Sequence, residues 1–191
     1  ASMLYLDYGR QDGQWVPNKY GDNKNLEAIE FFKHLNSVIR GRKDGAIIIA
    51  EESTAWPKVT KSPEEDGLGF TFKWNMGWMH DFLEYMKLDP YFRKFNHNMP
   101  GEYEDKFANL KVGYTFMLGH PGKKLLFMGQ DFGQFHEWDE KVSLDWYLTK
   151  EPFHADLQNY VKGLLTLYHK YPALYRLDEE YDGFQWINAN D

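Results

Sequence analysis

The sequence contains no cysteine, which excludes a disulfide framework, thiol chemistry and a cysteine-ligated zinc site. Basic residues are also few: 22 lysines and arginines stand against 29 aspartates and glutamates, giving a formal net charge of −7. This surplus of negative charge argues against a nucleic-acid backbone or an anionic membrane surface as a partner. No apolar run is long enough to span a membrane. We therefore expect neither nucleic acid nor membrane as a partner.

Several motifs of catalysis and cofactor binding are absent as well. The sequence has no G-x-G-x-x-G, no P-loop, no H-E-x-x-H and no G-x-S-x-G. His136, Glu137, Asp139 and Glu140 could supply ligands to a cation, but a solvated charged loop explains the same residues and is favoured. We expect no cofactor and no metal ion.

With 191 residues, the chain is long enough to form one domain with a sizeable core. Its aromatic share is 18%. Core packing explains most of these rings, and exposed rings that stack on sugars would explain the rest. The opening residues read like the inside of a strand, so we expect the chain to be a fragment of something longer.

Apolar residues at helical spacing predict four helices, the first capped by Asn25 and ended by Gly41. Extended segments are predicted at residues 2–5, 46–50, 70–74, 124–128 and 184–187. Strands that alternate with helices indicate an α/β fold with a parallel sheet. A complete eight-fold barrel needs about 250 residues, so the chain is either a small open sheet or part of a barrel.

The apolar run 46–50 is typical of a strand buried on both faces, and Glu51 and Glu52 follow it directly. In parallel sheets the chemistry lies beyond the carboxyl ends of the strands. Trp56 follows closely, and a carboxyl group beside an exposed indole suits a sugar: the ring stacks and the acid transfers a proton. Two ordinary surface glutamates remain the alternative.

A second dense stretch, residues 72–81, lies between an extended segment and a helix. It contains Trp74, Asn75, Trp78, His80 and Asp81, a mixture of rings, an amide and ionisable groups. The alternative is a pair of core-facing tryptophans, with His80 and Asp81 capping the helix.

Taken together, these stretches resemble the bacterial 1,4-alpha-glucan (glycogen) branching enzymes of the alpha-amylase superfamily, glycoside hydrolase family 13. The similarity covers nearly the whole chain. The motifs that carry it are ASMLYLDY (1–8), WVPN (15–18), NLEAIEF (25–31), AEEST (50–54), KWNMGWMHD (73–81), MPG (99–101), KFANL (106–110), HPGKKLLFMG (120–129), SLDW (143–146) and GFQW (183–186).

The resemblance implies an α/β fold, the second half of a (β/α)8 TIM barrel. Residues 1–182 would be the C-terminal portion of the catalytic barrel, and residues 183–191 the first strand of a β-rich C-terminal domain. It also implies three catalytic acids. Glu51 matches the general acid/base, whereas the nucleophilic aspartate would lie upstream of Ala1. The third acid would belong to a segment that is absent between Asn98 and Met99, either because it is deleted or because it is omitted from the sequence. We expect omission, so that the Cα atoms of Asn98 and Met99 lie farther apart than the about 3.8 Å that a peptide bond spans.

The implied activity is a retaining transglycosylation that cleaves α-1,4 bonds and forms α-1,6 branches in glycogen biosynthesis. Nothing in the acid pair decides whether water or a sugar 6-hydroxyl accepts the glycosyl group. An alpha-glucan hydrolase, another transglycosylase of the superfamily, or an inactive glucan-binding fragment are therefore the alternatives. The expected partner is an α-1,4-glucan such as glycogen or amylose, and the expected location is cytoplasmic. Position in the loops makes the following residues candidate glucan contacts: Trp56, Trp74, Asn75, Trp78, His80 and Asp81.

Overall fold

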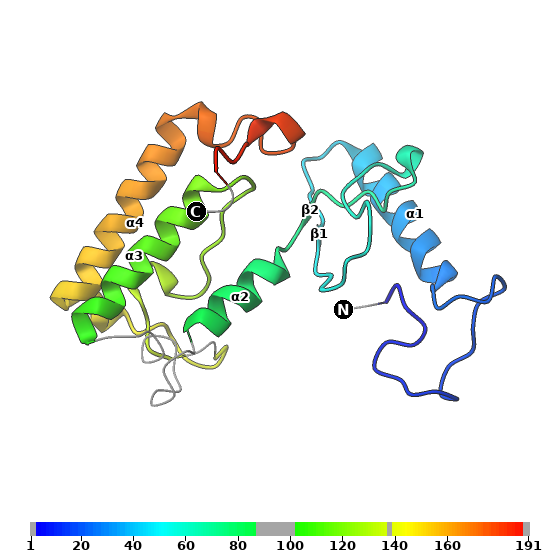
Figure 1. Ribbon diagram of the computed structural model, residues 1–191, viewed down its shortest axis with the longest axis horizontal. Helices are drawn as coiled ribbons and strands as arrows, with labels where there is room; N and C mark the ends of the chain where they lie inside the picture. The colour runs from blue at the N-terminus through cyan, green and yellow to red at the C-terminus, as the bar shows by residue number, and fades with distance from the viewer. Residues whose placement is uncertain (1–2, 87–101, 137–138, 189–191) are drawn as a thin grey trace. The chain divides into compact units, whose positions relative to one another are not determined.

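The computed structural model describes residues 3–86, 102–136 and 139–188. It divides into two compact units, Ala1–Phe82 and Leu83–Asp191, and each unit is described by itself (Figure 1). The expected break between Asn98 and Met99 lies outside the described residues.

The first unit begins with an isolated antiparallel bridge between Tyr5 and Lys24, which leads into helix α1, Leu26–Arg42. The side-chain oxygen of Asn25 accepts the backbone N–H of Ala28 at 3.1 Å, so the predicted cap is confirmed. The predicted end at Gly41 is wrong. The helix runs on through Arg42, and Lys43 ends it in the left-handed conformation, with φ of 54°.

A short parallel sheet follows α1. Strand β1, Ile49–Ala50, pairs with strand β2, Phe72–Lys73, in the register Ile49 to Phe72. The extended segment predicted at 70–74 is therefore confirmed as a strand only at Phe72 and Lys73, and the strand predicted at 46–50 only in its last two residues. Pairing with β2 begins at the carbonyl of Ile48, and Ile47, which precedes it, is 58% exposed.

The core of this unit lies between the sheet, α1 and the loop that joins the strands. It contains five buried residues, with Phe32 and Trp56 among the side chains packed against them. The buried members are Leu4, Ala50, Val59, Leu68 and Phe70. Helix α2, Met76–Met86, begins directly after β2.

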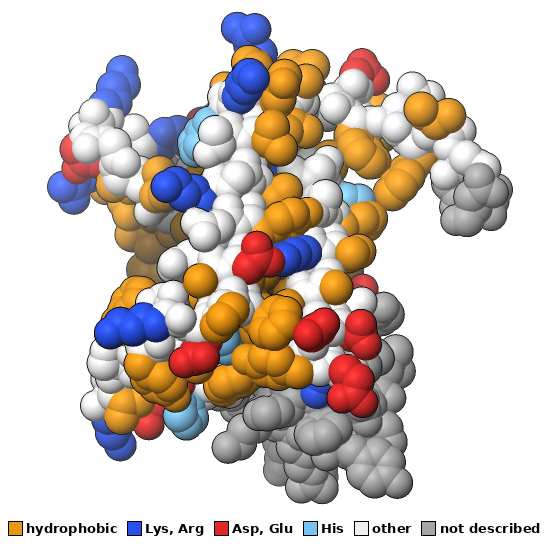
Figure 2. Space-filling view, turned by 90° about the vertical axis from the view of Figure 1, so that its left-hand side faces the viewer, with side chains coloured by type: hydrophobic (Ala, Val, Ile, Leu, Met, Phe, Trp, Pro, Cys, Tyr) orange, Lys and Arg blue, Asp and Glu red, His pale blue; other side chains and the backbone are white. Residues whose placement is uncertain are grey.

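The second unit is built on two long helices, α3 at Tyr103–Gly119 and α4 at Pro152–Lys170, which lie side by side (Figure 1). Both were predicted from their apolar spacing. Short 3-10 turns surround them at Gln130–Phe132, Trp146–Lys150, Pro172–Leu174 and Tyr181–Gly183. Phe107, Leu110, Phe132, Leu157 and Val161 are among the buried residues between these elements. Apolar and charged side chains are interspersed on the face shown in Figure 2.

Two predicted strands are not formed in the second unit. Residues 124–128 pair with no strand in the described part of the chain, and Leu125 and Phe127 are 51% and 50% exposed. Residues 184–187 likewise form no strand, and the rings of Phe184 and Trp186 pack on His120 instead. An apolar strand needs a neighbour for its backbone hydrogen bonds, and neither segment has one among the described residues.

The described residues are therefore rich in helix, with a single parallel pair of strands. That pair fits the predicted α/β class, whereas the barrel stays a prediction. Within the described ranges, no helix is long and apolar enough to cross a membrane.

Candidate active site

The two glutamates after β1 have opposite surroundings. Glu51 is exposed, whereas Glu52 is 4% exposed, and its carboxylate oxygen accepts the backbone N–H of Thr54 at 2.9 Å. Successive residues of an extended chain point to opposite sides, which accounts for the difference. Of the two carboxyl groups, only that of Glu51 is therefore accessible from solvent.

The parallel pairing brings the two predicted site stretches to one edge. Ala50 pairs with Lys73, and the backbone N–H of Trp74 donates to the carbonyl of Ala50 at 3.0 Å. Residues that follow β1 and β2 consequently leave the sheet at the same end. Glu51 and Trp74 are 23 positions apart in the sequence, but each directly follows one member of the paired residues Ala50 and Lys73.

Trp56 is half-buried. Its ring meets Tyr5 edge-on, with centroids 5.2 Å apart and an angle of 81°, and packs against the core of the first unit. One part of the indole is fixed by this contact while another part remains accessible. The ring is thus neither a fully buried core residue nor a free surface residue.

The start of α2 holds the remaining predicted residues. The side-chain oxygen of Asn75 accepts the backbone N–H of Trp78 at 3.0 Å, so Asn75 caps the helix. The alternative in which His80 and Asp81 cap it is wrong, because both lie inside α2 and both are exposed. Trp78 is half-buried and stacks on Phe82 with centroids 5.6 Å apart.

Of the four charged residues proposed near His136, Glu137 lies outside the described residues. The Nδ1 atom of His136 lies 2.6 Å from a carboxylate oxygen of Asp145, a residue that the sequence did not single out. Among the residues that the structure describes, no group of three or more histidine, aspartate or glutamate side chains is placed to hold a metal ion.

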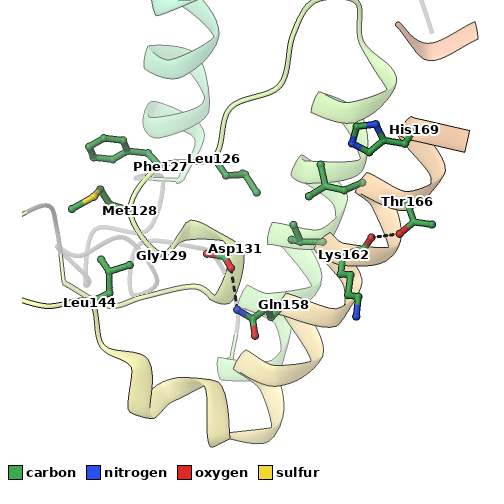
Figure 3. A pocket seen from close by; sticks show the side chains of 12 residues that line it. Leu126, Phe127, Met128, Gly129, Asp131, Leu144, Gln158, Lys162, Thr166 and His169 are labelled. Carbon is green, nitrogen blue, oxygen red and sulfur yellow. Dashed lines mark hydrogen bonds between the residues drawn. The ribbon is translucent and has the colours of Figure 1, made fainter. Parts of the chain in front are cut away.

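A cavity of about 640 Å3 lies within the second unit, between residues 126–129 and α4 (Figure 3). Leu126, Phe127 and Met128 form one apolar wall, and both apolar and polar side chains of α4 line the other side. Asp131 accepts the amide N–H of Gln158 at 3.0 Å and is the one carboxylate in the lining. The cavity lining therefore does not provide the two facing carboxyl groups that glycosyl transfer requires.

None of the predicted site residues lines this cavity, and sequence reasoning missed it. Its walls come from segments about 30 positions apart in the sequence, so no local pattern marks it. The available signal is a polar row on α4, spaced three to four residues apart on one face. The row consists of Gln158, Lys162, Thr166 and His169.

Comparison with known proteins gives relatives that match the whole chain. This chain is 59% identical to "1,4-alpha-glucan branching enzyme GlgB" of Butyrivibrio fibrisolvens. The match covers 100% of this chain and 35% of that protein. The chain is 46% identical to the proteins of the same name from Pseudomonas putida and Halothermothrix orenii, covering 30% and 36% of them. No family model matches the chain. The resemblance inferred from the sequence is confirmed.

The chain spans about a third of the length of these curated relatives. The aligned region is 224 positions long against 191 residues of this chain, a difference of 33 positions.

Proposed function

We propose that this chain is part of a 1,4-alpha-glucan branching enzyme, which cleaves α-1,4 bonds and forms α-1,6 branches in glycogen biosynthesis. The observation that carries the proposal is 59% identity over all of the chain to a relative of that name. An α-1,4-glucan, such as glycogen or amylose, would be the substrate, and the cytoplasm the location.

Glu51 would be the general acid/base. Its position just past β1, exposed while its neighbour Glu52 is buried, supports this role. In a retaining reaction Glu51 protonates the leaving glycosidic oxygen while a carboxylate about 5–5.5 Å away forms the glycosyl-enzyme. Glu51 then takes the proton of the incoming sugar 6-hydroxyl, so that the second step forms the α-1,6 bond.

The other two acids would come from outside this chain. The resemblance puts the nucleophile upstream of Ala1 and the third acid between Asn98 and Met99. The 33 extra aligned positions in the relatives support a missing internal segment. The proposed fold is the second half of a (β/α)8 barrel at 1–182, with residues 183–191 opening a β-rich domain.

Glucan contacts would lie around the shared end of β1 and β2. Trp56 and Trp78 are proposed to stack on sugar rings, because each packs against an aromatic neighbour and neither is fully buried. Trp74, Asn75, His80 and Asp81 complete the proposed contact set. Since Asn75 caps α2, its amide N–H2 group is the part left to meet a sugar hydroxyl.

A chimera tests this proposal. In it, the chain replaces the matching third of the Butyrivibrio fibrisolvens enzyme, which also contributes the 33 positions that this chain lacks. We expect amylose treated with the chimera to lose iodine colour and gain α-1,6 linkages, detected after debranching. The chain alone, with two acids missing, should give neither. Shorter chains without α-1,6 linkages would instead point to a hydrolase, and an inert, well-folded chimera would favour a glucan-binding fragment.

A further inference from the structure

Thr54 has contacts at each of its polar groups. Its backbone N–H donates to Glu52 at 2.9 Å, and its carbonyl accepts from the Lys73 ammonium at 2.9 Å. Its hydroxyl donates to the Tyr5 phenol oxygen at 3.3 Å and accepts the backbone N–H of Trp56 at 3.3 Å. A half-buried residue with this many partners has little freedom to move.

The partners of Thr54 come from three separate parts of the first unit. Tyr5 belongs to the N-terminal segment, Glu52 to the end of β1, and Lys73 to β2. The contacts therefore fasten the loop after β1 to the neighbouring strand and to the segment that precedes α1. The bond from Lys73 involves an ionised donor, which makes it stronger than a bond between neutral groups.

The residues on both sides of Glu51 along the chain are held by hydrogen bonds. Before it, the carbonyl of Ala50 accepts the backbone N–H of Trp74. After it, the buried carboxylate of Glu52 accepts from Thr54. The backbone of Glu51 is thereby held at both neighbours while its side chain remains exposed.

We infer that Thr54 is a positioning residue, with Lys73 and Tyr5 as its supports, that fixes Glu51 and Trp56 relative to the end of β2. The inference rests on the proposed role of Glu51. An acid that serves both steps of a transfer has to stay within about 0.5 Å of its productive position. A displacement of about 1 Å is enough to lower turnover about 100-fold.

The test uses the chimera described above. Thr54→Val keeps the shape of the side chain but removes the hydroxyl, and Thr54→Ser keeps the hydroxyl. We expect Thr54→Val to lower kcat about 10- to 100-fold with KM changed less than threefold, and Thr54→Ser to stay within about threefold of wild type. Thr60→Val, at an exposed threonine of the same unit, is the matched control and should change neither constant.

A second arm does not depend on activity. Hydrogen exchange in this chain should be at least tenfold faster over residues 51–56 in Thr54→Val, with the amides of α1 unchanged. Lys73→Met should act like Thr54→Val in both arms, and Lys73→Arg should restore the wild-type values, so the inference can be tested even if Thr54→Val does not fold.

The outcomes separate the two proposals. An inactive wild-type chimera would contradict the branching function, whereas the exchange arm would still report on the loop. An active chimera in which Thr54→Val and Lys73→Met keep the wild-type kcat would overturn the positioning role. A rise in KM at constant kcat would also overturn it, because that result assigns these residues to substrate binding.

Discussion

Tyr103 and His154 are joined by a hydrogen bond of 2.9 Å between the phenol oxygen and Nε2. The other ring nitrogen of His154, Nδ1, donates to the carbonyl of Phe132 at 2.7 Å. Nδ1 therefore carries the proton, and Nε2 accepts the proton of Tyr103. His154 is fully buried among aromatic rings, and each of its two ring nitrogens has a hydrogen-bond partner. The pair links α3 to α4 at the start of both helices.

Removing the phenol of Tyr103 should destabilise the chain. Tyr103→Phe leaves Nε2 of a buried histidine without a donor, a loss of about 1–3 kcal/mol in the free energy of unfolding. Urea titration followed by circular dichroism measures it. Tyr147→Phe, at a phenol that is 61% exposed, is the control and should cost less than about 0.5 kcal/mol. Equal losses for the two variants would contradict the structural role of the pair.

Glu51→Gln should abolish branching by the chimera while leaving its melting temperature unchanged. An amide can neither donate nor recover the proton, and the exposed position of Glu51 makes the change harmless to folding. Activity within tenfold of wild type would reject Glu51 as the acid/base. Glu52→Gln should be milder, since an amide oxygen still accepts the N–H of Thr54.

Replacing Trp78 should weaken glucan binding more than turnover. Trp78→Ala in the chimera removes the ring that stacks on Phe82, and we expect KM for amylose to rise about tenfold, with kcat lowered less than threefold. Trp15→Ala, at another half-buried tryptophan of the first unit, is the control. If KM is unchanged in Trp78→Ala, the Trp78 ring does not bind glucan and its role is purely structural.

The second unit should lose stability in alkali. The hydrogen bond to Asp178, 2.9 Å from the Lys123 ammonium, raises the pKa of Lys123, and burial together with Asp178 raises the pKa of Tyr168. Raised pKa values mean that the folded state holds these protons more tightly. The stabilisation is therefore complete below the ordinary values of 10.0 for tyrosine and 10.5 for lysine, and is lost as the pH rises above them.

Asp178→Asn tests this dependence through the melting temperature between pH 8 and pH 11. At pH 8 the variant should melt about 1–2 °C lower, as expected for a partly exposed ion pair worth about 0.5 kcal/mol. Its further decline toward pH 11 should be smaller than that of wild type. Asp182→Asn, at an exposed carboxylate nearby, should follow the wild-type curve. Parallel curves for wild type and Asp178→Asn would show that this pair does not cause the alkaline loss.

Local patterns were sufficient to predict where the helices occur, although not where α1 ends. Apolar spacing marks α1, α3 and α4, and the alternation of an extended chain separates the two glutamates. The strands were harder, because a strand forms only where another strand completes its hydrogen bonds. Within the run 46–50, only Ile49 and Ala50 pair with β2, whereas residues 124–128 pair with no strand in the described part of the chain.

Contacts between distant residues could not be predicted. The pairing of His136 with Asp145 and the bond from Lys73 to Thr54 depend on how loops fold back, and neither has a sequence period. The cavity beside α4 likewise arises only when residues 126–129 pack against that helix.

The apolar segment 124–128 also bears on how the chain behaves at high concentration. Around Leu125, which is 51% exposed, this segment pairs with no strand in the described part of the chain, and such a segment can pair with its copy in another molecule. Lysines commonly protect such edges by repulsion, but here Lys123 is engaged by Asp178 and Lys124 by the carbonyl of His120. Light scattering from the purified chain should therefore grow with concentration, and a charge introduced by Leu125→Lys should suppress that growth.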